Sequence, residues 1–293
     1  MKVFYSSPHY PNCADALEPL EIHFLGTGGG RFVTFNQMRR TAGYRMVHGE
    51  THVHVDPGPG AVVFSNWARL SPRKLDAVVV THCHPDHYTD AEVLVEAMTQ
   101  GTRTRSGLIA ASGSALCSEG STNSGISGYH QALAKQVVEL KPGVSFQVGV
   151  LNFTAVEARH SDPETVGLTV DVPEVGRIGY TSDTSFFPEL PQIHRGLRLL
   201  IVCVLRPRGR PLQHHFCTED AIELLRDARP RCCVITHFGI PMLRVGPESE
   251  AEHIEGETGV PTVAARDGMT VSLGERVEVR GPRKCDEPRH IET

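Results

Sequence analysis

The chain has 293 residues, a formal net charge of −5 and 40% apolar residues. This apolar fraction excludes a disordered chain and is large enough for a sizeable core. The slightly acidic balance argues against binding to nucleic acid or anionic membranes through the charge of the whole protein.

The N-terminal segment and the longest apolar run predict where the protein works. Residues 1–19 contain no apolar core of signal-peptide length, and the longest apolar run, residues 199–205, is too short to cross a membrane. We therefore expect a soluble, cytoplasmic protein with no membrane partner. The 8 cysteines form no CxxC pair, so a disulfide framework is not expected. Small, buried apolar side chains are expected at Cys117, Cys203, Cys232 and Cys233.

The first part of the chain predicts an irregular lead-in over residues 1–19 and then strands with two helices. Strand patterns occur at 20–26, 43–48, 51–56 and 75–80, and helix-like apolar spacing occurs at 61–70 and 89–99. The run at 75–80 is apolar throughout, as expected for a strand buried on both faces. Residues 101–128 are rich in Gly, Ser and Thr and predict a long surface loop or flap, with SGLIAAS as a candidate short strand.

The second part of the chain is dominated by strands. They are predicted at SFQVG, LNFTAVEA, VGLTVDV, RIGYTSD, RLLIVCV, RCCVITH, PTVAA, MTVSL and RVEVR. Residues 218–228 predict an amphipathic helix with Cys217 or Thr218 near its start. We expect one α/β domain over 20–280, with pseudo-halves of about 20–140 and 145–280, and a polar tail at 281–293.

Four segments place metal-ligand residue types at the C-terminal end of an apolar strand. The first is VVVTHCHPDH at 78–87, and the others end in His160, Asp183 and His237. Strand ends are rigid, so loops that begin there can hold several ligands in a fixed arrangement. The pattern predicts a metal centre assembled from distant parts of the chain.

Local geometry divides the first segment into two half-sites. On an extended backbone, His82 and His84 project to the same side and can reach one ion, while Cys83 points away from both. The proline that follows ends the strand, so Asp86 and His87 turn toward a second ion nearby. Imidazole and carboxylate together suit zinc, manganese, iron or nickel.

The motifs THCHPDH, EARHS, YTSDT and VITHF occur in this order, and together they resemble the metallo-β-lactamase-fold hydrolases over residues 20–273. FLGTGGG and HVDPGPG are similar to the opening of the ribonuclease Z-like and phosphodiesterase branch. The resemblance implies a four-layer αββα sandwich of two mixed β-sheets. It also implies a dinuclear metal site at the sheet edges and leaves a homodimer open.

The resemblance further implies a role for each ligand residue in binding two divalent ions, with zinc expected first. One metal would be held by His82, His84 and His160, the other by Asp86, His87 and His237, with Asp183 bridging them. Asp56 matches a carboxylate that hydrogen-bonds to ligand histidines and orients them. True β-lactamases of this fold usually have Cys where Asp183 stands, which argues against antibiotic hydrolysis as the main activity.

Two such ions can hold a bridging hydroxide at neutral pH and stabilise an anionic transition state, so hydrolysis is the expected reaction. Asp86 and His215 are the expected catalytic residues. QHHFCTEDAIELL resembles the H-x-S/T segment of ribonuclease Z-like enzymes, which puts His215 at the proton donor and Cys217 at the Ser/Thr. Alternatively, His214 and His215 are surface residues. GTGGGR lacks phosphate-loop spacing and predicts a tight turn at the rim.

Several activities are compatible with these residues. The favoured one is a phosphodiesterase for small or cyclic phosphodiesters, with an anionic small-molecule ester as substrate and no residues yet assigned to bind it. A tRNA 3′-end endonuclease is less favoured, because only 22 residues separate His160 from Asp183 and leave no room for a tRNA-binding arm. A lactonase or other carboxylic-ester hydrolase would use the same ligands. A non-catalytic metal-binding protein and a flavodiiron-like redox protein are alternatives of a different class.

Overall fold

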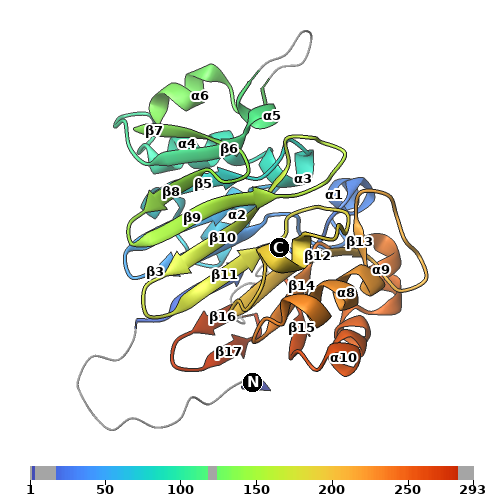
Figure 1. Ribbon diagram of the computed structural model, residues 1–293. Coiled ribbons are helices and arrows are strands. Elements are labelled where there is room, and N and C mark those ends of the chain that lie inside the picture. The colour runs from blue at the N-terminus through green and yellow to red at the C-terminus, as the bar shows by residue number, and fades with distance from the viewer. Residues whose placement is uncertain (1, 4–17, 118–123, 283–293) are drawn as a thin grey trace, which may run out of the picture.

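Two β-sheets stacked face to face form the centre of the computed structural model, which describes residues 2–3, 18–117 and 124–282 (Figure 1). Within those residues the first sheet has nine strands. Their order is β1 (Lys2–Val3), β17 (Val277–Arg280), β16 (Met269–Leu273), β2 (Leu20–Phe24), β3 (Tyr44–His48), β4 (Thr51–Val55), β5 (Ala77–Val80), β6 (Leu108–Ser112) and β7 (Gln136–Leu140).

The second sheet mixes parallel and antiparallel strands. Its order is β15 (Thr262–Ala264), β14 (Cys233–Thr236), β12 (Leu199–Arg206), β11 (Gly176–Tyr180), β10 (Val166–Val172), β9 (Leu151–Glu157) and β8 (Ser145–Val148), and β13 (Phe216–Cys217) pairs with β12. The strands from β11 to β15 pair in parallel, whereas β8 to β11 form an antiparallel meander. Parallel strands place their C-terminal ends at one edge, where loops can meet.

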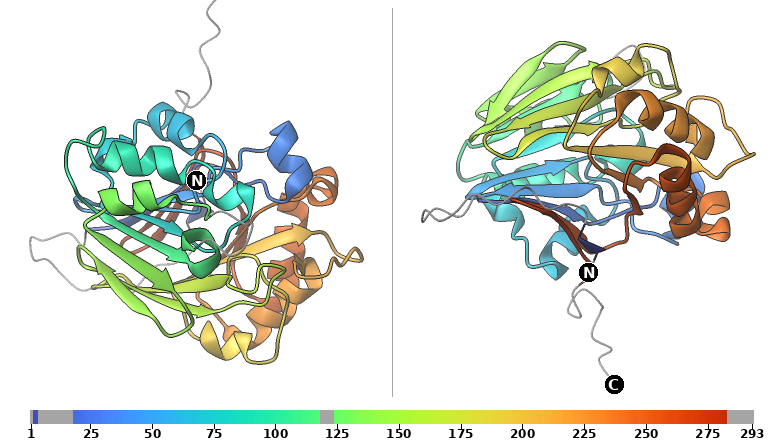
Figure 2. Two further views of the ribbon diagram at one scale, coloured as in Figure 1. Left: turned by 90° about the horizontal axis from the view of Figure 1, so that it is seen from above. Right: turned by 60° about the horizontal axis from the view of Figure 1, so that its bottom comes forward.

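Helices cover the outer face of each sheet, as the views in Figure 2 show. On the first sheet they are α2 (Ala61–Trp67), α4 (Ala91–Met98), α5 (Gly113–Leu116) and α6 (Gly128–Leu133), with the short 3-10 helix Pro72–Lys74. On the second sheet they are α7 (Leu190–Ile193), α8 (Thr218–Ala228), α9 (Ile240–Val245) and α10 (Pro247–Thr258). Helices α1 (Arg31–Asn36) and α3 (Pro85–Tyr88) lie against each other.

Three apolar clusters match these layers. The largest lies between the sheets, where alternate residues of β9, such as Phe153, meet residues of the facing sheet, such as Met46. A second cluster joins the second sheet to α7, α8 and α10, and a third joins the first sheet to α2 and α4. The predicted four-layer αββα sandwich is therefore confirmed.

The C-terminal strands return to the first sheet. Strand β16 pairs with β2 in antiparallel register, Met269 opposite Phe24, and β17 pairs with β16. The two sheets therefore do not coincide with the expected pseudo-halves, since the first sheet takes strands from both ends of the chain. Residues 2–3 of the expected lead-in form β1 on β17, and residues 4–17 and 283–293 lie outside the described part.

Three sequence expectations need correction or extension. Residues 101–128 contain β6, an interior strand of the first sheet, and α5 as well as loops, although residues 118–123 lie outside the described part. Strand β7 and helices α9 and α10 were not predicted. Cys117 is exposed rather than buried, whereas Cys203, Cys232 and Cys233 are buried as expected.

No helix among the described residues has both the length and the apolar character needed to cross a bilayer.

Candidate metal centre

The first ligand segment follows β5 and turns into a helix halfway along. His84 is still extended, with φ −91° and ψ 144°, and the proline after it begins α3. Nε2 of His82 lies 3.1 Å from Nδ1 of His84, so the two rings lie on the same side as the extended pattern predicted. Asp86 and His87 belong to α3 and contribute to a second group. Cys83 packs with the apolar residues beneath α4 and belongs to neither group.

Three histidines form the first group. His160, in the loop after β9, lies with Nε2 3.1 Å from Nδ1 of His84. Its Nδ1 donates a hydrogen bond to the carbonyl oxygen of His214 at 2.8 Å, which leaves Nε2 facing the other rings. Burial lowers the pKa of all three rings, and neighbouring imidazoles lower the pKa of His82 and His84 further. The rings are therefore neutral at pH 7, and each can offer a lone pair to a cation.

Asp86, His87 and His237 form the second group. Nε2 of His237 lies 3.1 Å from Nε2 of His87 and 3.3 Å from Oδ2 of Asp86. The backbone N–H of Gly30 donates to the same Asp86 oxygen at 2.8 Å, so the Gly-rich turn lies at the site as predicted. Glycine is required at position 29, because a Cβ added to Gly29 would lie 2.3 Å from the His237 ring.

The second group concentrates negative charge around one imidazole. Burial alone would lower the pKa of His87, but Asp56 and Asp86 outweigh burial and raise this pKa to about 10. Burial alone would raise the pKa of Asp86, but His87 and His237 hold it well below its usual range. One positive charge therefore lies among several carboxylates. A divalent cation carries two positive charges and would balance the negative charge of these carboxylates better than a single proton does.

Asp183 lies between the two groups. Its Oδ2 is 3.8 Å from Nε2 of His160 and 3.9 Å from Nε2 of His87, and its Oδ1 is 3.2 Å from Nδ1 of His237. Burial would raise the pKa of Asp183, but the surrounding histidines, His237 first among them, lower it to about 2. An ionised carboxylate that faces both groups is well placed to bridge two cations.

The spacing and chemistry of these donors fit divalent cations. Tetrahedral zinc with Zn–N distances of about 2.0–2.1 Å would hold its nitrogen ligands roughly 3.3 Å apart. The closest nitrogen pairs in both groups are 3.1 Å apart. Two nitrogens approach Nδ1 of His84, which carries at most one hydrogen, so hydrogen bonds alone do not satisfy the cluster. Oδ1 of Asp183 and Nδ1 of His237 are also buried without a hydrogen-bond partner among the described residues.

Asp56 lies behind the second group and accepts four hydrogen bonds. The donors are the N–H of Thr81 at 2.8 Å, the hydroxyls of Thr81 and Tyr180 at 2.9 Å each, and Nδ1 of His87 at 3.0 Å. The last bond determines that Nε2 of His87 faces the group, as expected for a residue that orients a ligand histidine. Sequence reasoning missed Tyr180 and Thr81, because neither residue type signals a contact with a distant carboxylate.

Left-handed backbone conformations, which residues other than glycine rarely adopt, recur around the site. They occur at Asp56 (φ 52°), Ser182 (φ 54°), His214 (φ 67°) and His237 (φ 64°). Each such conformation costs roughly 1 kcal/mol or more and persists where surrounding contacts hold it. Here they aim neighbouring side chains in directions that a regular strand or helix would not allow.

The two histidines before α8 occupy different positions. Nδ1 of His215 lies 3.4 Å from Oδ2 of Asp183, and its ring centroid is 4.8 Å from that of His160. His214 contributes its carbonyl oxygen to His160 instead. Burial lowers the pKa of His215 to about 4, although Asp183 opposes this, so the ring is neutral at pH 7. With 17% of its side chain exposed, His215 reaches the solvent side of the cluster.

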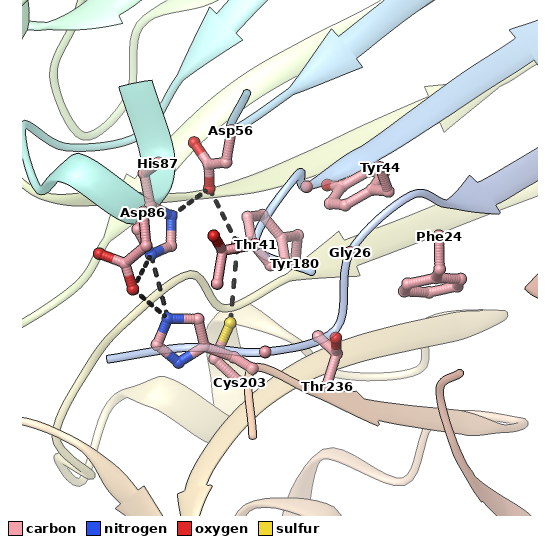
Figure 3. Close-up of a pocket in the computed structure, with 13 residues that line it drawn as sticks. Phe24, Gly26, Thr41, Tyr44, Asp56, Asp86, His87, Tyr180, Cys203 and Thr236 are labelled. Atoms are coloured by element: carbon pink, nitrogen blue, oxygen red, sulfur yellow. Dashed lines mark hydrogen bonds and ion pairs between the residues drawn. The ribbon is translucent and has the colours of Figure 1, made fainter. Parts of the chain in front are cut away.

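Cys203 adds a donor that sequence reasoning did not assign to the site. Its Sγ lies within 4.8 Å of ligand atoms of Asp183 and His237. A cavity of about 20 Å³ is lined by Cys203 and by the second group, and Figure 3 shows Cys203 and Tyr180 pointing toward each other beside it. An apolar run such as 199–205 gives no sign that one of its members reaches a metal site.

Comparison with known proteins identifies the family of this chain. A family model described as the beta-lactamase superfamily domain matches residues 51–238, which is more than half of the chain and includes both groups. The chain belongs to the beta-lactamase superfamily. Its two mixed sheets and outer helices form the metallo-β-lactamase fold.

Two curated relatives of this superfamily member differ in how much of the chain they match. The uncharacterised protein MJ1374 of Methanocaldococcus jannaschii is 39% identical over 256 residues, covering 87% of this chain and 95% of that protein. The ribonuclease Z of Thermococcus kodakarensis is 34% identical over 79 residues, covering 27% of this chain and 24% of that enzyme.

Solved structures share the fold at low sequence identity. The metallo-β-lactamase-fold protein YhfI from Bacillus subtilis has a TM-score of 0.71 at 18% identity, covering 87% of this chain and 99% of that one. The short form of human tRNase Z has a TM-score of 0.65 at 16% identity, covering 86% of this chain and 99% of that one. A diphosphatase from the PhnP family has a TM-score of 0.63 at 16% identity, covering 89% of this chain and 99% of that one.

Proposed function

We propose that this superfamily member is a dinuclear metal-dependent phosphodiesterase that acts on small or cyclic phosphodiesters. The observation that carries the proposal is the position of His215. It places a neutral imidazole 3.4 Å from Asp183, on the solvent side of a cluster with two ligand groups. The ribonuclease Z and PhnP-family proteins of similar sequence or fold support phosphoester chemistry.

In this proposal the two groups hold two divalent ions. His82, His84 and His160 bind one, Asp86, His87 and His237 bind the other, and Asp183 faces both. When bound, such ions polarise a phosphoryl oxygen and make water a nucleophile at neutral pH. Zinc suits the imidazole-rich set best, and manganese, iron and nickel are the alternatives.

The side chains of the protein position the ions and the leaving group. Asp86 and Asp183 have lowered pKa values, so both stay ionised and supply the negative charge that retains cations. In its protonated form, His215 donates the proton of the ring nitrogen that does not face Asp183 to the leaving oxygen, and the ring is left neutral. An anionic phosphodiester at this position favours the protonated imidazole and so assists the transfer.

The connection between the third and fourth ligand segments favours small substrates over tRNA. Strands β10 and β11 pair directly, with Val172 opposite Gly176 and only a three-residue turn between them. No tRNA-binding arm of the kind expected for a tRNA 3′-end endonuclease therefore leaves the sheet at this point. A lactonase or carboxylic-ester hydrolase stays the second candidate, because the same ligand set would serve it.

A substrate panel on the metal-analysed protein tests the proposal. The panel contains bis-p-nitrophenyl phosphate, a cyclic nucleotide, a lactone, a cephalosporin and a precursor tRNA, with chelator-treated protein as the control. We expect metal-dependent hydrolysis of the phosphodiesters above all others. Faster turnover of the lactone, or 3′ cleavage of the tRNA without activity on small phosphodiesters, would replace the proposal with the corresponding alternative.

A further inference from the structure

Cys203 lies within β12, opposite Thr236 of β14, which is the residue before His237. Its side chain is 3% exposed and points from β12 into the space between the sheets. Its backbone N–H donates to the hydroxyl of Thr181 at 3.1 Å, and its Sγ lies 3.6 Å from the hydroxyl of Tyr180. These contacts hold the sulfur on the side of the metal centre.

Two buried polar atoms next to this sulfur have no hydrogen-bond partner among the described residues. They are Oδ1 of Asp183 and Nδ1 of His237, which face each other at 3.2 Å. Both residues are at most 5% exposed. Burying polar atoms without partners costs free energy, and a cation bound by Oδ1 of Asp183 would offset part of that cost.

The thiol, the carboxylate and the imidazole could contact one cation together. Ligand atoms of Cys203, Asp183 and His237 all lie within 4.8 Å of one another, and all three residues are buried. The cavity lined by Cys203 and His237 has a volume of about 20 Å³, which is enough for a guest the size of a water molecule or an ion. Thiolate sulfur is a strong ligand for zinc and cobalt.

We propose that Cys203 supplies a thiolate ligand to the metal centre on its Asp183–His237 side. The inference rests on the proposed function in one respect, that the cluster binds divalent ions. Binding breaks the S–H bond, forms a metal–sulfur bond and releases the proton to solvent. A sulfur ligand shifts the preference of the centre toward zinc and cobalt and away from manganese, which prefers oxygen ligands.

Absorption spectroscopy of the full chain loaded with Co²⁺ tests the proposal directly. Thiolate bound to Co²⁺ gives an intense sulfur-to-cobalt charge-transfer band in the near ultraviolet, which nitrogen and oxygen ligands do not give. We expect the band in the wild-type protein and its loss in Cys203→Ala. The matched control is Cys83→Ala, which removes a partly buried thiol between two ligand histidines and should keep the band. A band that survives Cys203→Ala, or no band in wild-type protein that has bound cobalt, overturns the proposal.

Metal competition gives a second measurement and separates this inference from the proposed function. We expect the zinc-over-manganese preference of Cys203→Ser, with its fold checked by circular dichroism, to be about 10-fold lower than that of the wild type. An unchanged preference overturns the inference. Neither readout uses turnover, so phosphodiester hydrolysis without a sulfur band rejects only the Cys203 ligand. A sulfur band without phosphodiester hydrolysis rejects only the proposed activity.

Discussion

Asp56 accepts a hydrogen bond from Nδ1 of His87 at 3.0 Å, with both side chains 3% exposed. Because Nδ1 is bonded to the carboxylate, Nε2 is the nitrogen that faces His237 and the second ligand group. Asp56 in turn depends on donors from two other strand ends, Thr81 and Tyr180. The orientation of this candidate ligand is therefore determined by residues that belong to neither ligand group.

Replacing Tyr180 with phenylalanine tests this chain of contacts. The variant loses the 2.9 Å hydrogen bond to Asp56 while keeping the ring that packs edge-on against Tyr44. We expect about 10-fold weaker binding of one of the two metal ions, because His87 is held less firmly. Chelator competition measures the affinity, and Tyr129→Phe, at an exposed position, is the control. Equal affinities of Tyr180→Phe and wild-type protein would show that Tyr180 does not support the ligand.

Replacing His84 with alanine tests the first ligand group. Nδ1 of His84 is the atom that both His82 and His160 approach at 3.1 Å, so its loss removes the centre of the group. We expect the variant to bind at least one metal ion fewer per chain and to lose hydrolysis. Elemental analysis and the phosphodiester assay measure the two effects, with His253→Ala on α10 as the control. Unchanged metal content together with an unchanged rate would contradict the assigned role.

The pair His215→Ala and His214→Ala tests which histidine serves the leaving group. His215 directs its ring toward Asp183, whereas His214 acts through its backbone oxygen, which alanine keeps. We expect His215→Ala to lower phosphodiester turnover by a factor on the order of 10²–10⁴ while metal stays bound. His214→Ala should have a much smaller effect. A large loss of turnover in His214→Ala together with a small loss in His215→Ala would identify His214 as the proton donor instead.

Replacing Glu250 with glutamine tests how the loop that carries His215 is anchored. Oε2 of this fully buried carboxylate accepts hydrogen bonds from the N–H of Arg208 at 3.1 Å and from the hydroxyl of Thr218 at 2.5 Å. We expect the variant to be roughly 1–3 kcal/mol less stable and to turn over substrate more slowly. Urea unfolding measures the stability, and Glu252→Gln, exposed on the same helix, is the control. Equal unfolding midpoints for Glu250→Gln and wild type would argue against the anchor.

The pH dependence of stability tests the burial of His194. Burial lowers the pKa of this fully buried ring from 6.5 to about 4. Between these values the unfolded chain binds a proton and the folded chain does not, so stability should fall as the pH drops from 6.5 toward 4. The loss attributable to His194 is about 3 kcal/mol.

The variant His194→Leu isolates this contribution. Leucine cannot take up a proton, and the side chains of Leu197 and Leu200 lie with the His194 ring around Gly179. We expect its stability to fall less steeply than that of the wild type between pH 6.5 and 4, as measured by urea unfolding. Parallel pH profiles for the two proteins would mean that His194 is not the residue that titrates.

Sequence reasoning succeeded wherever the signal was local. The fully buried strand β5 and the amphipathic helix α8 follow from runs and periods of apolar residues. The common side of His82 and His84 follows from the period of an extended backbone. Sequence reasoning failed to predict β7 and α10. Strand β7 has a largely exposed face, and α10 carries so many charged residues that its buried stripe is hard to recognise.

The order of residues along the chain by itself determined the class of fold, the candidate ligands and the division of THCHPDH into two half-sites. Each depends on residue type and on spacings of a few positions. The family resemblance implied that Asp183 bridges the groups and that His215 serves the site, but only the tertiary structure could place these side chains side by side, and only it revealed that Cys203 lies beside them. These are contacts between strand ends far apart in sequence. They depend on how the two sheets stack and on the left-handed turns that aim each side chain, and no short stretch of sequence records either.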